Sequence, residues 1–495
     1  IPLARGHGWA SYLGDLAVDW QLMTASTEFN RPNATLYTYE AGGVDDEYAF
    51  DYINSINQYN LWETMEEDSE NYRLDLELPL EPIAGISWTF KTGIFEQNRD
   101  REGTYHKFNY SGTVRNKVPD EVRFDPDPRR LFVPEYIGSG EEGSGPLTAN
   151  TGTIKPEDDV GLAGNDYLLE QEYNAFYYLV KANLFQKLDV NVGLRQESFE
   201  VAFEQYEYAP EPLSPILDED RELPSLLLNY MFSDTLQLRA AYSKTVSWPE
   251  SFELIPRLFY DFETLIRYRG NPELKPADIK NYDLRLEWYP SDTESITLAW
   301  FSKDLKNAVE NRFDGGFDDF TYYTFANIDD SEIDGWELDL RKTFVLGALQ
   351  GHEIFVQFNY TDISSSVDVA QAVDDYKEYD PDRPLQGQPD YIVNLQLGYD
   401  HVDTQQEITL IFNRKGEELA VVSPPSTSNV ANVYELPFND LKFIYKKSFD
   451  NGMAVSFSVD NILDEKREME YENYNAPYYS SSPGRKFKLK LNYSF

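Results

Sequence analysis

The chain is built from short stretches in which apolar and polar residues alternate one for one. Residues 270–290 begin with the Gly- and Pro-rich GNPELKPAD and continue into the strictly alternating IKNYDLRLEWYP. One set of alternate positions is apolar: Tyr282, Leu284, Leu286 and Trp288. The other set is charged: Asp283, Arg285 and Glu287. Because successive side chains of a strand point to opposite sides, this pattern predicts a β-strand with one apolar and one charged face.

The same alternation recurs along the whole chain, for example in residues 235–242, 335–342, 391–400, 452–461 and 484–495. In GWELDLRK, residues 335–342, the polar positions are Glu337, Asp339 and Arg341. A helical interpretation fails because a period of two scatters the apolar residues around a helix. The sequence therefore predicts an all-β fold.

Short and long connections alternate between the predicted strands. The short ones have the length of tight turns and lie at 185–189, 232–235, 290–294, 402–405 and 449–452. The long ones are polar and rich in aromatic residues, at 31–70, 111–166, 208–220, 248–278, 313–331, 364–388, 416–433 and 464–484. In an antiparallel meander this alternation gathers every short turn at one end and every long loop at the other, around about 16 strands.

These features favour an antiparallel transmembrane β-barrel, whose turns are short on one side and whose loops are long on the other. A soluble sandwich or propeller is the alternative, since its sheets also alternate. Many predicted strands, such as the one through 167–185, exceed the five or six residues usual in soluble sheets. No apolar run reaches the roughly 18 residues of a transmembrane helix. Barrel strands are too short and too alternating to produce such a run.

Composition and charge exclude several classes of function. Lys plus Arg number 43 and Asp plus Glu 87, which gives a net charge of −44, and the mean hydropathy is −0.56. So acidic a chain lacks the basic face that nucleic-acid binding requires. There is no Cys, which excludes thiol catalysis, disulfides and Cys-ligated zinc. The 36 Tyr residues suit strands and boundaries between apolar and wet surroundings.

Several segments, taken in order, resemble the C-terminal barrel of TonB-dependent outer-membrane receptors. They are RAAYSKTVSWPESFELIP (239–256), GNPELKPADIKNYDLRLEWYP (270–290), ITLAWFSKDLKNAVEN (296–311), IDGWELDLRKTF (333–344), VDNILDEKREMEY (459–471) and GRKFKLKLNYSF (484–495). The resemblance covers most of 167–495. It implies a 22-stranded barrel closed by an N-terminal plug domain. We expect this chain to supply about 16 of a probable 22 strands and no plug domain, so that 1–495 forms a partial barrel.

Three explanations for the shortfall stay open. The chain is part of a longer receptor, pairs with a further polypeptide that completes the barrel, or closes by itself as a smaller pore. The resemblance implies active uptake of a scarce, bulky nutrient, such as an oligosaccharide or a ferric siderophore, across the outer membrane of a Gram-negative bacterium. A passive pore, or a structural outer-membrane barrel within a larger complex, is the alternative function.

The same resemblance implies the partners. The expected ones are outer-membrane lipid and lipopolysaccharide, the TonB–ExbB–ExbD system acting through the plug, and a surface lipoprotein or other polypeptide. No nucleic acid is expected. The charged strand positions Asp283, Arg285, Glu287, Glu337, Asp339 and Arg341 are expected to face the lumen, where they would meet the plug or line the pathway.

The candidate ligand site is the extracellular mouth. Aromatic faces and Arg side chains there could bind sugar rings or an anionic chelate. Packing of a long loop on itself, or an aromatic girdle, explains the same residues equally well. The candidates are Trp248, Phe252, Tyr260, Arg267 and Arg269 of the 248–278 loop, with Tyr322, Tyr323, Tyr474 and Tyr478 of neighbouring loops.

Metal and catalytic motifs are weak. DSEIDG at 330–335 imitates the start of an EF-hand, but the twelfth position is Arg341, so we interpret it as a loop end entering a strand. Asp314, Asp318 and Asp319 are weak candidates for loop-bound Ca²⁺ or Mg²⁺. The four His residues are scattered, and neither an HExxH nor a GxSxG motif occurs. We therefore predict no resident cofactor and no enzymatic activity.

Overall fold

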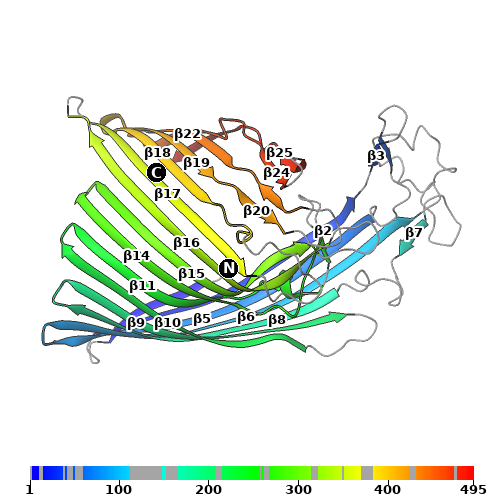
Figure 1. The fold of residues 1–495 in the computed structure, drawn as a ribbon, viewed down its shortest axis with the longest axis horizontal. Helices are drawn as coiled ribbons and strands as arrows, with labels where there is room; N and C mark the ends of the chain where they lie inside the picture. Colours follow the sequence, from blue (N-terminus) through cyan, green and yellow to red (C-terminus); the bar gives the residue numbers. More distant parts are fainter. Residues whose placement is uncertain are drawn as a thin grey trace.

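The computed structural model describes residues 3–10, 15–36, 39–41, 48–50, 59–111, 148–151, 166–206, 214–256, 258–260, 267–313, 322–347, 351–368, 383–422, 431–472 and 476–494. These residues are almost entirely strand. Figure 1 shows one large, strongly curved sheet, with the short turns between its strands at the left.

The main sheet is an antiparallel meander in which each strand pairs with its neighbours along the chain. Its members are β1 (Leu3–Ala10), β2 (Leu16–Leu36), β5 (Tyr59–Ile83), β6 (Ile86–Ser111), β8 (Asp166–Leu184), β9 (Leu188–Tyr206), β10 (Ser214–Ser233), β11 (Leu236–Ser247), β14 (Ala277–Ser291), β15 (Glu294–Phe313), β16 (Tyr322–Val345), β17 (His352–Asp368), β18 (Tyr391–His401), β19 (Gln406–Lys415), β22 (Phe438–Ser448), β23 (Met453–Asp460) and β26 (Lys486–Tyr493). The predicted all-β, antiparallel class is confirmed.

Shorter elements lie in the long connections. β7 (Thr148–Thr151), β12 (Leu258–Tyr260) and β13 (Arg267–Arg269) join the main sheet and bring it to 20 strands. β3 (Tyr39–Ala41) and β4 (Tyr48–Phe50) form a hairpin. β20 (Glu418–Val421), β21 (Val433–Glu435), β24 (Arg467–Tyr471) and β25 (Pro477–Ser481) form a separate four-stranded sheet. The helical elements are α2 (Ser251–Leu254) and the 3₁₀ turn η5 (Val402–Thr404).

None of the helices in this described part of the chain has the length and apolar character needed to cross a membrane. Among the described residues, β1 pairs only with β2 and β26 only with β23. No pairing found there therefore joins the two ends of the meander.

The described part of the meander has 17 strands, in agreement with the predicted number of about 16, with β1 as the additional one. The predicted strand limits were wrong in several places, because strands reach further into the predicted loops: β2 extends to Leu36, β5 begins at Tyr59 and β16 begins at Tyr322. β5 shows the physical reason for the last difference. Its alternation continues on the N-terminal side of Tyr72, but the outward positions there are the acidic Glu70, Asp68 and Glu66 instead of apolar residues.

The two faces of the main sheet differ as the alternation predicts. On β14 the apolar side chains point outward, and Tyr282, Leu284, Leu286 and Trp288 stay 37–47% exposed. The opposite, inner face of the same strand carries Glu287, which is 3% exposed. The register carries this inner face continuously from β8 through β11, β14 and β17.

Toward the long-loop end, the outward face of β5 to β10 turns acidic. Asp68 lies directly opposite Asp100 and Asp100 opposite Glu170. One row away, Glu172 lies opposite Glu200. All five are exposed, and no ion pair to them is found among the described residues. β5 and β6 are 25 and 26 residues long, although about 9–11 residues suffice to cross a membrane. The acidic rows therefore lie on the parts of the strands that exceed this length.

Candidate ligand-binding site

The 248–278 connection folds back onto the inner face of the sheet. Within it, Leu254, Ile255 and Leu274 are 0%, 1% and 2% exposed. They pack with Leu169 of β8 and Val201 of β9 in one hydrophobic cluster. The connection thus contributes its own core, so self-packing accounts for much of its apolar content.

Trp248 begins this connection and is fixed on three sides. Its ring lies 5.2 Å from the Phe199 ring, and its indole nitrogen donates to Glu197 Oε2 at 3.1 Å. The Arg221 guanidinium lies 6.0 Å from the Trp248 ring and donates to Asp278 at 2.8 Å. Asp278 is near the start of β14, so both ends of the connection are held at the same place.

A cleft of about 270 Å³ opens on the inner face beside Trp248. Its walls combine aromatic rings with amide, guanidinium and carboxylate groups: Phe95, Gln97, Arg99, Gln171, Tyr173, Phe199, Trp248, Pro249 and Glu250. Edge-to-face contacts order the rings, at 5.7 Å for Phe95 with Tyr173 and 6.2 Å for Tyr173 with Phe199. Preformed aromatic walls with a few polar groups are typical of small-molecule sites.

The polar groups of the cleft are only partly satisfied. Gln171 donates to Ser251 Oγ at 2.9 Å, and Arg99 donates to Gln171 at 3.4 Å. Arg99 Nε lies 3.5 Å from a Glu67 oxygen but makes no hydrogen bond within the described residues. A buried N–H group of this kind favours a ligand that brings an acceptor.

A larger hollow of about 890 Å³ lies elsewhere. Many of its lining side chains, among them Trp20, Leu22, Tyr72 and Ile94, are the exposed outward residues of β2, β5 and β6. A hollow on the outward face of a barrel opens toward lipid. The smaller inner cleft is therefore the better candidate for ligand binding.

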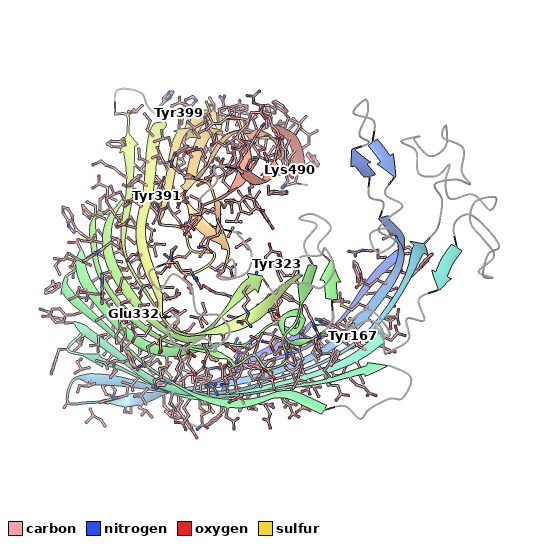
Figure 2. The ribbon with its side chains drawn as sticks, turned by 45° about the vertical axis from the view of Figure 1, so that its right-hand side comes forward. Tyr167, Tyr323, Glu332, Tyr391, Tyr399 and Lys490 are labelled. Carbon is pink, nitrogen blue, oxygen red and sulfur yellow. The ribbon has the colours of Figure 1, made fainter. Side chains whose placement is uncertain are left out.

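A second aromatic group continues from the same hydrophobic cluster. Phe325 is 2% exposed and contacts both Phe252, at 5.4 Å, and Tyr268, at 6.0 Å. Tyr323 then joins Tyr478 of β25 through their hydroxyl groups, which are 3.0 Å apart. Figure 2 labels Tyr323 near the middle of the picture and Tyr167 at its lower right. A hydrogen bond thus links β16 of the main sheet directly to the four-stranded sheet that contains β25.

The structure brings only part of the predicted ligand set together. Trp248, Phe252, Tyr323 and Tyr478 belong to the two connected aromatic groups described above. Arg269 is placed through its backbone, since its carbonyl oxygen accepts a bond from Thr324 at 3.0 Å. For Tyr260, Arg267 and Tyr322 only the strand backbone is described, and Tyr474 lies outside the described residues. Tyr322 and Tyr323 were expected in a loop but begin β16.

The charged inner positions form a network within the chain. Glu287 accepts bonds from Arg285 at 2.9 Å and Tyr289 at 2.9 Å, and also from Gln237. Asn359 donates to Glu337 at 2.9 Å and to Asp339 at 2.7 Å. A 3.5 Å ion pair between Arg285 and Asp339 joins the two halves. These inner charges thus pair with one another within the chain. Asp283 and Arg341 are exposed on the same face.

Sequence reasoning missed one buried ion pair. Arg383 and Glu310 form a double hydrogen bond, at 3.1 and 2.6 Å, and their side chains are 4% and 6% exposed. The backbone N–H of Gln386 also donates to Glu310, at 2.9 Å. The partners are 73 residues apart, so no local pattern could have paired them. The pair therefore holds the segment that precedes β18 in place against β15.

The metal candidates gain no support. Asp314, Asp318 and Asp319 lie outside the described residues. The DSEIDG stretch lies inside β16, so its interpretation as a loop end was wrong, and a continuous strand leaves no EF-hand loop. Within the described ranges, no group of three or more His, Asp or Glu side chains is placed to hold a metal ion.

Comparison with known proteins identifies relatives. The profile of the family described as "TonB dependent receptor-like, beta-barrel" matches residues 8–462. No match is found among curated proteins. The pyoverdine outer membrane receptor FpvA from Pseudomonas aeruginosa PAO1, bound to pyoverdine, has a TM-score of 0.61 at 13% identity, over 100% of this chain and 61% of that one.

Two further solved structures give similar values. The unliganded ferric citrate transporter FecA has a TM-score of 0.59 at 12% identity, over 96% of this chain and 61% of that one. FpvAI in its complex with pyocin S2 has a TM-score of 0.60 at 14% identity, over 100% of this chain and 56% of that one. At such identities the similarity concerns the fold, and the chain spans little more than half the length of these proteins.

Proposed function

The chain belongs to the TonB-dependent receptor-like β-barrel family, as its motifs predict, and on that premise we propose that it takes up a scarce, bulky nutrient across the outer membrane of a Gram-negative bacterium. Members of the family are outer-membrane β-barrels and are transporters rather than enzymes. The TonB–ExbB–ExbD system would supply the energy through a plug domain. The reaction is binding and gated passage, without breaking a covalent bond.

The observation that carries the proposal is the cleft beside Trp248. It faces inward, on the side toward which the long connection folds, and its rings are held by contacts that need no ligand. A site preformed in this way binds with a smaller loss of conformational entropy. Its position near the long-loop end suits a ligand that arrives from outside the cell.

The chemistry of the cleft favours a neutral, polyhydroxylated ligand such as an oligosaccharide. Aromatic faces of the Trp248 and Phe199 kind pack against the apolar faces of sugar rings. Gln97, Gln171 and Glu250 offer both donors and acceptors to hydroxyl groups. The chain has 87 acidic and only 43 basic residues, and this negative charge disfavours a strongly anionic ligand. A ferric siderophore is therefore the less favoured substrate.

Binding to the purified, detergent-solubilised chain tests the ligand class. Calorimetric titration with linear glucose, xylose and mannose oligomers, and with a panel of ferric siderophores, should give saturable binding of one oligosaccharide. Trp248→Ala should weaken that binding at least tenfold. Phe185→Ala, which alters a 71% exposed ring at a short turn, is the matched control and should leave it unchanged. If the chain binds a ferric siderophore instead, and Trp248→Ala abolishes that binding, the proposed substrate class is wrong but the proposed site is correct.

Transport tests the proposed function itself. In cells that express the full-length protein, accumulation of the labelled ligand should stop when the proton gradient is collapsed. Accumulation that persists without the gradient, together with a steady large conductance in a planar bilayer, would contradict gated uptake and indicate a passive pore.

A further inference from the structure

Two charged side chains of β9 lie next to the cleft beside Trp248, on the side nearer the short turns. Arg195 and Glu197 are two positions apart on the inner face of the strand, and Arg195 Nε donates to Glu197 Oε1 at 2.5 Å. The Glu197 side chain is only 10% exposed, and that of Arg195 is 35% exposed. The cleft itself is lined by other residues, so neither of these two side chains would touch the ligand.

Glu197 holds Trp248 through the second oxygen of its carboxylate. Trp248 Nε1 donates to Glu197 Oε2 at 3.1 Å, while Oε1 accepts the bond from Arg195. Hydrogen bonds to a charged carboxylate are stronger than bonds between neutral groups. Because the indole ring has a single N–H group, this bond fixes the edge of the ring that carries it.

Arg195 extends the same chain of hydrogen bonds to a second wall of the cleft. A terminal nitrogen of its guanidinium donates to the Tyr173 hydroxyl at 3.0 Å. Tyr173 belongs to β8, whereas Trp248 begins the 248–278 connection, and both line the cleft. The donors of a guanidinium form a rigid, planar fork, so they fix the directions in which their two acceptors lie. One ion pair thus joins two aromatic walls that come from different segments.

The ring contacts of these walls do not replace the ion pair. Tyr173 meets Phe95 and Phe199 edge to face at 5.7 and 6.2 Å, and Trp248 lies 5.2 Å from Phe199 and 6.0 Å from the Arg221 guanidinium. Such contacts are weaker and less directional than hydrogen bonds to charged groups. The ring contacts therefore fill the space, and the hydrogen bonds select the orientation.

We propose that Glu197 and Arg195 are positioning residues of the ligand site, which hold the rings of Trp248 and Tyr173 in the orientation that the ligand meets. This role rests on the proposed function, because it assigns the two rings to the binding of a polyhydroxylated ligand. Without the ion pair the Trp248 ring would be free to turn, and binding would have to order it at an additional cost in conformational entropy.

Two substitutions of Glu197 test the effect on Trp248 without any ligand. Trp248 is one of eight Trp residues, so its indole N–H resonance in isotope-labelled chain in detergent can be assigned by its loss in Trp248→Phe. Glu197→Leu removes the acceptor and should move that resonance upfield. Glu197→Gln keeps a neutral acceptor and should move it much less. Glu200→Leu, the same change at an exposed outward position of β9, is the matched control and should leave the resonance in place.

Ligand affinity tests whether this orientation matters for binding. The oligosaccharide should bind at least tenfold more weakly to Glu197→Leu, less weakly to Glu197→Gln, and with unchanged affinity to Glu200→Leu. Tyr173→Phe removes the hydroxyl at the other end of the chain of hydrogen bonds. Its loss of affinity should not add to that of Glu197→Gln in the double variant, because both act through one network.

The outcomes separate the positioning role from the proposed function. An unchanged Trp248 resonance in Glu197→Leu would overturn the positioning role, whether or not a ligand binds. Equal ligand affinity in Glu197→Leu and the unsubstituted chain, or fully additive losses in the double variant, would overturn it as well. A resonance that moves as expected in a chain that binds no oligosaccharide would support the positioning of Trp248 but contradict the proposed ligand class.

Discussion

Acidic residues occur in two regions of the sheet under opposite conditions. On the outward face of β5 to β10, Asp68, Asp100 and Glu170 lie side by side, exposed and without an ion pair among the described residues. On the inner face of β14 to β17, Glu287 is almost fully buried and accepts bonds from Arg285, Tyr289 and Gln237. The carboxylates on the outward face of these long strand ends are thus exposed and unpaired, whereas Glu287 on the inner face is buried and paired.

The difference follows from solvation. An exposed carboxylate keeps its water and needs no partner, whereas a buried one must recover the lost hydration through hydrogen bonds. The net charge of −44 is therefore no obstacle to a membrane fold. Next to the acidic rows, the outward face carries a band of exposed apolar residues, and this band marks where the sheet meets lipid.

The largest effect is expected from a charge placed in that band. Leu286→Arg should lower the free energy of unfolding by about 2–4 kcal/mol, the cost of Arg near the bilayer midplane. Asp100→Arg, on the same outward face but within the acidic rows, should be neutral or slightly stabilising. Urea unfolding of chain reconstituted in phospholipid vesicles measures both. Equal losses in the two variants would place the acidic rows inside the membrane.

A smaller loss is expected when a carboxylate of the inner network is neutralised. Glu287→Gln leaves the guanidinium groups of Arg285 and Arg239 without their common partner and should cost about 1–3 kcal/mol. Asp283→Asn changes an exposed residue of the same strand and face and should cost far less. The same unfolding assay compares them. If Asp283→Asn is the more damaging, the network is not what stabilises this wall.

The acidic rows should respond in the opposite direction. Asp100→Asn removes repulsion from the carboxylates on both neighbouring strands and should raise the free energy of unfolding by about 0.2–1 kcal/mol. Asn98→Asp, which faces Glu70 and Glu172, is the matched reversal and should lower it. Both effects should shrink in 0.5 M salt because exposed charges are screened. A salt-independent change would show that repulsion is not the cause.

Much of this organisation was predictable from local pattern. Alternation at 282–288 and 336–341 gave strands, faces and the positions of Glu287 and Asp339, since a period of two depends only on neighbours along the chain. The N-terminal part of β5 was missed because its acidic outward residues were interpreted as loop, and the end of β2 and the start of β16 were missed as well. Contacts between distant segments were also missed, among them Arg383 with Glu310 and Trp248 with Phe199. Such pairs depend on how strands register and where loops fold back, which no local window contains.

The smallest expected effect concerns Glu253, a half-buried carboxylate for which no ion pair is found among the described residues. Burial in α2 raises the pKa of Glu253 above its ordinary 4.5, and the nearby Glu250 adds to this, although the Glu250 backbone N–H, 2.8 Å away, opposes it. Because the folded protein holds this proton more tightly than the unfolded chain, α2 should lose stability as the pH rises from 4.5 through the raised pKa. Glu253→Gln keeps the hydrogen bond and abolishes this dependence. Hydrogen exchange of amides 251–256 between pH 4.5 and 7.5 would measure the difference, and identical pH profiles for both proteins would contradict the assignment.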